Sequence, residues 1–326
     1  MLHRKRRIAL FSVITLFFSL AFVFFLLFLF LKDAIFPQKK PVVFGSTYMT
    51  MDNQYFEVLN SYIESLVEAN GDVLITRDGA NSQQKQNEQI LDMLNMGVDF
   101  IFINPVDAKL AMTSLAECER RKVPYIAVDS SLEGRGNTMQ VGTVVSDNYA
   151  AGALVAQDLM RNRKSAKIVV FYDKNIESTC TRFQGFLDTL NAQSFDYRIL
   201  FTAFGTTLLH ETMIEAQKFL NLQLDFDTIF GSNDPAALGS LAAIQHNNMW
   251  QSQLVYGIDG SPASKMMISQ GFMQASAAQF PSEIAKTAVN AAYRYVKSGE
   301  RLGLCKVGVQ LVTKENVSDF NIMGWQ

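Results

Sequence analysis

Four polar residues follow short apolar runs, and their side chains suit hydrogen bonding to a small polar ligand. The runs end at Asn104, Asp129, Asn233 and Asp259. Carboxylates accept hydrogen bonds, and the carboxamide of asparagine both donates and accepts them. Each residue alone could instead cap a following helix, which is a common role of Asn and Asp. Four of them, spread over both halves of the chain, indicate a shared binding site more strongly than four unrelated caps.

The sequence offers little chemistry beyond binding. It contains no Walker phosphate-binding motif, no G-x-G-x-x-G after the first apolar run and no G-x-S-x-G nucleophile motif. His210 and His246 lie in expected helices without a second metal ligand at suitable spacing. Cys118, Cys180 and Cys305 have no clear activating partner, so we expect structural thiols. We therefore expect no enzymatic activity, no metal and no cofactor.

The polar residues belong to a regular alternation of strands and helices that begins after Pro41. Short apolar runs followed by longer amphipathic stretches are typical of βαβ units, and strands that are apolar throughout are typical of sheets covered on both faces. Two α/β lobes suit a chain of this length, although alternation alone leaves an eight-stranded barrel open. The expected strands are 42–46, 73–76, 100–103, 167–172, 199–203, 228–230 and 254–257, and the expected helices are 55–69, 83–96, 108–121, 179–190, 207–220 and 235–247.

Composition agrees with a packed globular protein. Of 326 residues, 48% are hydrophobic and 18% are charged, which is too apolar for general disorder. The formal net charge is −2, so the chain has no overall basic field that would attract nucleic acid. We expect no nucleic-acid partner.

The first forty residues differ from the rest. A basic segment, His3–Arg7, precedes the uncharged stretch 8–31, which is dense in Phe and Leu. As a helix this stretch spans about 36 Å, enough to cross a bilayer core. No small-residue cleavage site follows it, and Cys118 is the first cysteine, so we expect an uncleaved anchor rather than a cleaved signal or a lipid anchor. The positive-inside rule places the N-terminus in the cytoplasm and the rest outside.

Several short segments together carry a family resemblance. From Pro41 onward the chain resembles the type I periplasmic sugar-binding proteins of the ribose-binding kind, over essentially its whole remaining length. Each segment alone is a weak signal, but their order and spacing are specific. They are Asp52–Phe56, Ile103–Asp107, Val128–Asp129, Ser146–Asn148, Arg182–Phe186, Phe230–Asp234, Gly257–Gly260 and Ala278–Pro281.

The resemblance implies two doubly wound parallel-sheet lobes joined by a three-segment hinge, with the ligand in the cleft between them. We expect residues 1–40 to form the cytoplasmic tip, the transmembrane helix and a linker. The N-terminal lobe is expected to comprise 41–146 and 280–308, and the C-terminal lobe 147–279 and 309–326.

The resemblance also implies a set of ligand residues on both sides of the cleft. Polar members would bind the hydroxyl groups of a sugar, and aromatic members would pack on its apolar faces. The sequence departs from the ribose-binding pattern at two positions. Ser130 stands where ribose-binding proteins have a second arginine, and Ile258 stands where they have an aromatic residue. Ribose itself is therefore in doubt. The expected ligand-binding residues are Asn53, Tyr55, Phe56, Asn104, Asp129, Ser130, Arg182, Phe204, Asn233, Asp259 and Gln279.

The resemblance implies a monosaccharide or polyol ligand and two possible membrane partners. One is an ABC-type sugar permease, for which this protein would be the tethered receptor. The other is a sensor histidine kinase that reads the liganded form, a role that an uncleaved anchor favours. Transcription repressors share this two-lobe fold, but they need a DNA-binding segment where this chain has its hydrophobic stretch.

Overall fold

A computed structural model describes residues 17–28, 40–133, 138–249 and 253–326. The chain divides into two units, Met1–Pro41 and Val42–Gln326. In the first unit, residues 17–28 are helical, and the rest of the expected anchor lies outside the described residues. Within the described ranges, no helix has the length and hydropathy needed to cross a bilayer.

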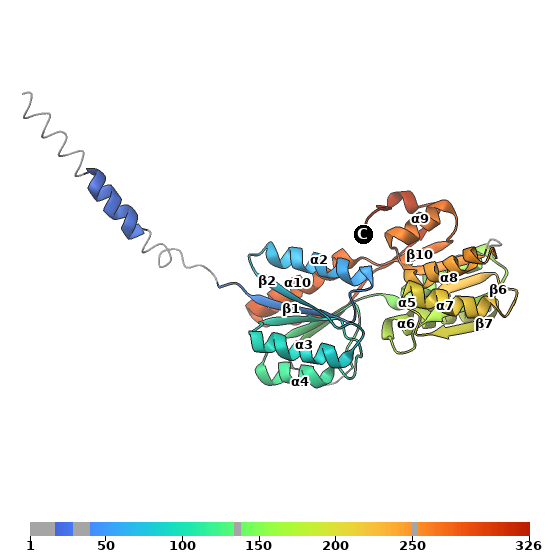
Figure 1. The fold of residues 1–326 in the computed structure, drawn as a ribbon, viewed down its shortest axis with the longest axis horizontal. Helices are drawn as coiled ribbons and strands as arrows, with labels where there is room; N and C mark the ends of the chain where they lie inside the picture. The colour runs from blue at the N-terminus through green and yellow to red at the C-terminus, as the bar shows by residue number, and fades with distance from the viewer. Residues whose placement is uncertain (1–16, 29–39, 134–137, 250–252) are drawn as a thin grey trace, which may run out of the picture. The chain divides into compact units, whose positions relative to one another are not determined.

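The second unit contains two six-stranded sheets with the same order of strands (Figure 1). The first sheet has the order β11-β5-β4-β3-β1-β2 and is parallel throughout. The second has the order β12-β10-β9-β8-β6-β7, with only β12 antiparallel to its neighbour. The strands are β1 (Val43–Tyr48), β2 (Val73–Asp78), β3 (Phe100–Ile103), β4 (Tyr125–Val128), β5 (Gln140–Ser146), β6 (Ser165–Tyr172), β7 (Asp196–Phe204), β8 (Thr228–Gly231), β9 (Leu254–Asp259), β10 (Ala275–Ala278), β11 (Gly303–Val307) and β12 (Gln310–Thr313).

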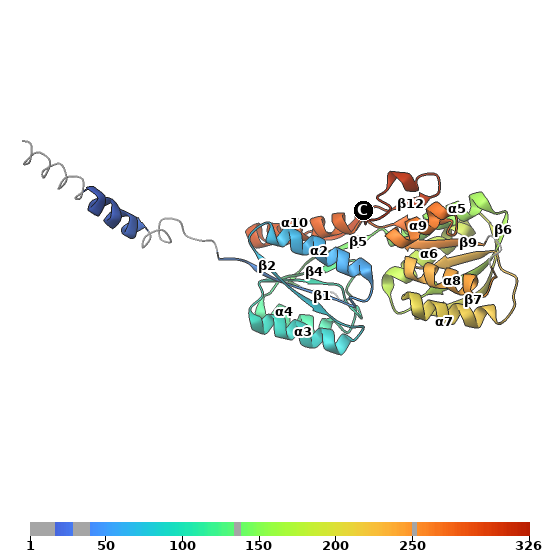
Figure 2. The same ribbon diagram turned by 45° about the horizontal axis from the view of Figure 1, so that its top comes forward.

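Helices cover both faces of each sheet, as the apolar strands require (Figure 2). Around the first sheet, α2 and α10 pack on one face and α3 and α4 on the other. Around the second, α5 and α6 pack on one face and α7, α8 and α9 on the other. The helices are α2 (Gln54–Glu68), α3 (Gln83–Met96), α4 (Met112–Arg121), α5 (Asn148–Asn162), α6 (Glu177–Ala192), α7 (Leu209–Leu220), α8 (Asp234–His246), α9 (Pro262–Gln270) and α10 (Pro281–Ser298), followed by the 3-10 turn η1 (Val317–Asp319).

This arrangement confirms the expected alternation and excludes a single barrel. The chain passes between the sheets three times: after β5, after β10 and after β11. The helix expected over 108–121 begins only at Met112, because the Asp107 carboxylate accepts from the backbone N–H groups of Lys109 and Leu110 and holds a turn there.

Two glycines allow α5 and α6 to approach closely. A Cβ atom at Gly152 would lie 1.8 Å from the carbonyl oxygen of Arg182, and one at Gly185 would lie 2.1 Å from that of Tyr149. Any larger residue would therefore force the helices apart. This contact fixes the position of Arg182, which the site below depends on.

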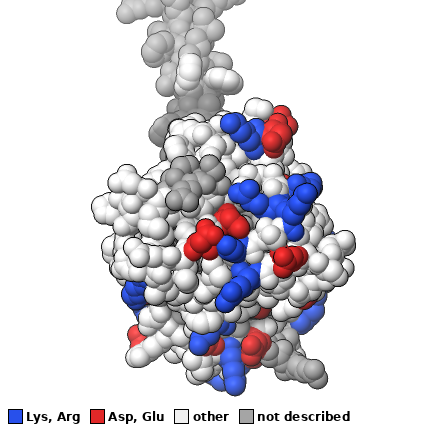
Figure 3. All heavy atoms as spheres, turned by 90° about the vertical axis from the view of Figure 1, so that its right-hand side faces the viewer, with Lys and Arg blue, Asp and Glu red and all other residues white. Residues whose placement is uncertain are grey.

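The outer end of the second lobe carries a mixed surface. Figure 3 shows Lys and Arg interspersed with Asp and Glu on this face, without a continuous area of one sign. Such a face does not present the basic field that nucleic-acid binding needs.

Candidate functional site

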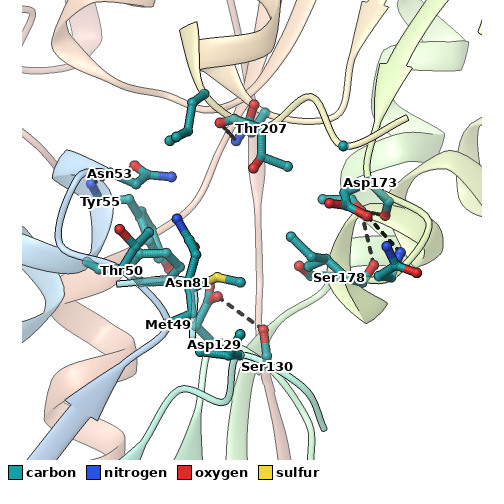
Figure 4. Close-up of a pocket in the computed structure, with 18 of the residues that line it drawn as sticks. Met49, Thr50, Asn53, Tyr55, Asn81, Asp129, Ser130, Asp173, Ser178 and Thr207 are labelled. Carbon is teal, nitrogen blue, oxygen red and sulfur yellow. Dashed lines mark hydrogen bonds between the residues drawn. The ribbon is translucent and has the colours of Figure 1, made fainter. Parts of the chain in front are cut away.

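A polar pocket of about 520 Å³ lies where the carboxyl ends of strands from both sheets face each other. Figure 4 shows Thr50, Asn53 and Asn81 on one side of an open space, with Asp173 and Ser178 opposite them. Open α/β sheets bind ligands at the carboxyl ends of their strands. The pocket is lined by Met49, Thr50, Asn53, Tyr55, Phe56, Asn81, Gln83, Val106, Asp107, Leu110, Asp129, Ser130, Asp173, Asn175, Ile176, Ser178, Thr179, Arg182, Gly205, Thr207, Leu208, Glu211, Asn233, Asp259 and Gln279.

Two of the expected ligand residues, Asn104 and Phe204, do not line the pocket, whereas the others do. Asn104 is fully buried. Its side chain accepts from the backbone N–H of Met49 at 3.2 Å and donates to the carbonyl of Val128 at 3.2 Å. Asn104 therefore ties together the ends of β1, β3 and β4, beneath the pocket wall.

Phe204 points toward solvent instead of the pocket. It ends β7, the edge strand of the second sheet, and 51% of its surface is exposed. Its ring packs edge-on against Tyr172, and the Lys174 ammonium lies 5.2 Å from the ring centroid. Of the three aromatic residues expected to pack on a sugar, only Tyr55 and Phe56, both in the first lobe, line the pocket.

The two carboxylates at the strand ends sit in unusual backbone conformations. Asp129 follows β4 with φ = 64°, and Asp259 ends β9 with φ = 145°. L-residues rarely adopt positive φ, and such strain concentrates at functional sites. β4 and β9 hold the same place in their respective sheets. Each lobe therefore supplies one buried carboxylate from the equivalent strand.

Arg182 is held rigidly at the second-lobe wall. Its Nε donates to Asn148 Oδ1 at 2.8 Å, and its Nη1 donates to the carbonyl of Ser232 at 2.9 Å. The same Nη1 lies 3.6 Å from Asp259 Oδ1. The side chain is almost completely buried, so the guanidinium is preorganised rather than free to swing.

Asp259 has an environment that disfavours its charge. Burial and the neighbouring Asp234 carboxylate raise the pKa of Asp259 to about 8, although Arg182 opposes the shift. Gln279 Nε2 donates to Asp259 Oδ1 at 2.7 Å, while the Oε1 atom of Gln279 has no hydrogen-bond partner among the described residues. Burial likewise raises the pKa of Asp129.

Capping explains part of the polar set. Asn233 Oδ1 caps α8 by accepting from Ala236 N at 2.9 Å, and Asn53 Oδ1 caps α2 by accepting from Tyr55 N at 3.0 Å. Neither Asp129 nor Asp259 is an N-cap of a helix. Each of the two asparagines thus both caps a helix and lines the pocket.

Several pocket residues were not expected from the sequence. Asp173 follows β6 directly, so the rule of polar residues at strand ends would have found it. Asn81 and Thr207 each stand three residues beyond the end of a strand, β2 and β7 respectively, in loops whose direction the sequence pattern does not reveal.

The C-terminal segment reaches the back of the pocket. The ring of Trp325 packs edge-on against Tyr55, with centroids 5.7 Å apart. Gln326 Nε2 donates to the carbonyl oxygens of Asp259 and Gln279 at 3.0 and 2.6 Å. The buried Lys265 ammonium anchors the segment through the carbonyl of Gly324 at 2.7 Å and Gln326 Oε1 at 2.9 Å.

Comparisons with known proteins agree with this fold. The family described as "Periplasmic binding protein domain" matches residues 44–301. The ribose import binding protein RbsB of Bacillus subtilis (strain 168) is 29% identical over 262 residues, covering 78% of this chain and 81% of RbsB. The galactofuranose-binding protein YtfQ of Escherichia coli (strain K12) is 25% identical over 304 residues, covering 87% of this chain and 93% of YtfQ.

A solved structure gives the same fold. The Caulobacter myo-inositol binding protein bound to myo-inositol superposes with a TM-score of 0.81 at 22% identity, covering 88% of this chain and 98% of that one. With two lobes, a polar pocket between them and the family match, the molecule is an extracytoplasmic solute-binding protein and not an enzyme. The chain belongs to the periplasmic binding protein family.

Proposed function

We propose that this protein is a membrane-tethered receptor that closes on a monosaccharide or related polyol outside the cytoplasm and presents it to an ABC-type sugar transporter. The pocket carries this proposal, because its polar groups come from both sheets and include donors and acceptors suited to hydroxyl groups. The names of RbsB and YtfQ, and the myo-inositol of the solved structure, support the same class of ligand.

Closure is the proposed mechanism. We take the lobes as 41–146 with 280–308 and 147–279 with 309–326, linked by the three chain crossings. A ligand that contacts Asp129 in one lobe and Arg182 in the other stabilises the closed form by its differential affinity. The transporter then recognises the closed shape.

Titration calorimetry of the purified protein against pentoses, hexoses and cyclic polyols tests the ligand class. We expect binding of at least one of them with a dissociation constant below about 100 µM, as a buried set of several hydrogen bonds allows. The absence of binding to this panel and to its amino-substituted analogues would contradict the proposal.

Anchoring is the second part of the proposal, and the uncharged stretch 8–31 supports it. We expect cell fractionation to find the full-length chain in membranes and residues 41–326, expressed alone, in the soluble fraction. Recovery of a native protein whose N-terminus begins after residue 31 would show that the stretch is a cleaved signal.

The same stretch favours a second candidate role, as the ligand-sensing partner of a membrane histidine kinase, since a permanent anchor fixes the protein beside a membrane partner. Neighbouring genes separate the two roles: permease and ATPase genes would indicate uptake, and a kinase with a response regulator would indicate sensing.

A further inference from the structure

The charge of the pocket is unbalanced. Among the described residues that line it, five are acidic (Asp107, Asp129, Asp173, Glu211 and Asp259) and only Arg182 is basic. Because the pKa of Asp259 is raised to about 8, Asp259 is mostly protonated at pH 7, and the excess comes from the other four. An adjoining outer groove adds Lys109 and Lys174, but also Glu133 and Glu177, so it does not offset the excess. The formal net charge of the whole chain is only −2, so this excess is a local property of the pocket.

Asp129 is the carboxylate with the least compensation. It is 4% exposed, and its Oδ1 atom has no hydrogen-bond partner among the described residues. Its Oδ2 atom accepts only long bonds, from Asn104 Nδ2 at 3.4 Å and Ser130 Oγ at 3.5 Å. The hydroxyl of Tyr55, which also lines the pocket, lies beside Asp129 and opposes the rise that burial causes in the pKa of that carboxyl, but neither the Tyr55 hydroxyl nor Asp129 Oδ1 makes a well-formed hydrogen bond among the described residues. Buried carboxylates are normally paired with a cation or with several strong donors.

Arg182 attracts the Asp129 carboxylate and also opposes the rise that burial causes in its pKa, but it forms no ion pair with Asp129. Its Nε and Nη1 atoms are committed to Asn148 and Ser232, and its ion pair at 3.6 Å is with Asp259. No described Lys, Arg or His side chain forms an ion pair with Asp129. Ser130, adjacent to Asp129 and lining the same pocket, is small and neutral, so it leaves space on that side.

We propose that the ligand is an amino sugar or an amino-substituted cyclic polyol, whose ammonium group binds Asp129 beside Ser130. This inference rests on the proposed function and narrows its class of ligand. An ammonium group supplies three donors and a positive charge, which satisfies the free Oδ1 atom and offsets part of the acidic excess. The hydroxyl groups of the same ligand remain available to Arg182, Asp259 and Gln279 across the pocket.

Matched ligands test the inference with the full-length protein in detergent micelles. Glucosamine, galactosamine, mannosamine and an inosamine are each titrated beside the parent hydroxyl compound, and the three sugars also beside their N-acetyl derivatives. We expect at least one amine to bind about tenfold or more tighter than its hydroxyl counterpart at pH 7, and N-acetylation to remove this advantage, because a charge-assisted hydrogen bond is roughly twice as strong as a neutral one.

Variants locate the preference at Asp129. In Asp129→Asn, which keeps the shape of the side chain, we expect the ratio of amine to hydroxyl affinity to fall to about one; a merely structural role would weaken both ligands equally. Ser130→Arg, which supplies a guanidinium of the protein's own, is expected to weaken the amine by about tenfold or more. Glu215→Gln, on the outer part of α7 and outside the pocket, is the matched control and should keep the ratio of wild type.

The outcomes distinguish the two proposals. If neutral sugars or polyols bind and every amine binds equally or more weakly, the inference is wrong while the proposed function stands. If neither class binds, the proposed function itself is contradicted. An amine preference that persists in Asp129→Asn would place the ammonium elsewhere and overturn the assignment to Asp129.

Discussion

At the scale of single residues, the site is built from carboxylates that the backbone forces into place. Asp129 and Asp259 occupy positive-φ conformations at the ends of two equivalent strands, and both are almost fully buried. Such conformations cost of order 1–3 kcal/mol each and persist only where the surroundings determine them. Both side chains line one pocket, and the Oδ1 atom of Asp129 has no hydrogen-bond partner among the described residues, so it is available to a ligand.

Asp259→Ala tests the role of this residue directly. We expect ligand binding to be lost, because Arg182 and Gln279 lose their shared partner, while the fold remains intact. Calorimetry measures the affinity and a thermal melt measures the fold. Asp225→Ala, which removes an exposed carboxylate paired with Lys167, is the control. An affinity within about threefold of wild type would remove Asp259 from the binding site.

The raised pKa of Asp259, about 8, predicts how stability depends on pH. In the folded state the carboxyl keeps its proton up to that pH, whereas in the unfolded chain it ionises near pH 4, so unfolding releases a proton in between. The free energy of unfolding of wild type should therefore fall, relative to Asp259→Asn, by up to about 1.4 kcal/mol per pH unit as the pH rises from 5 to 7.5. Urea unfolding at several pH values measures this, and parallel curves for the two proteins would contradict the shift.

At the scale of elements, the close pair α5 and α6 positions the only basic residue among the described pocket residues. Asn148 begins α5 and holds Arg182 of α6, and the two helices meet at Gly152 and Gly185 without side chains between them. The glycines have a steric role here, since helix propensity alone would favour alanine at both positions.

Gly152→Ala should separate the two helices. The added Cβ would meet the carbonyl oxygen of Arg182 at 1.8 Å, a contact with backbone that cannot rotate away. We expect a loss of about 1–3 kcal/mol in the free energy of unfolding and weaker ligand binding, as measured by urea unfolding and calorimetry. The control is Gly308→Ala, where a Cβ atom has no neighbour within 4 Å. A Gly152→Ala protein as stable as wild type would mean that the helices do not pack as described.

At the scale of the whole binding unit, the C-terminal segment joins groups from both lobes. Trp325 packs on Tyr55 of α2, while Gln326 bonds to the ends of β9 and β10. The ring nitrogen of Trp325 is buried without a partner among the described residues. This segment therefore lies where movement of one lobe against the other would change its surroundings.

Tryptophan fluorescence should report closure. The sequence has two tryptophans, Trp250 and Trp325. We expect a ligand to change the emission of the Trp250→Phe protein, in which Trp325 remains beside Tyr55. Unchanged emission of this protein at a saturating ligand concentration would show that the contact between Trp325 and Tyr55 does not respond to the ligand.

The alternation of strands and helices can be read from the amino-acid sequence, because burial on both faces leaves an apolar pattern that needs no knowledge of distant contacts. The strand-end positions of Asn104, Asp129, Asn233 and Asp259 can be read in the same way, since the end of an apolar run is visible locally. The three-dimensional packing was needed to show that Asn104 turns inward to tie three strands and that Phe204 faces solvent from an edge strand. It alone brought Asp173, Thr207 and Trp325 to the same pocket region, because loops and a C-terminal segment far apart in sequence meet there only through the packing of the two sheets.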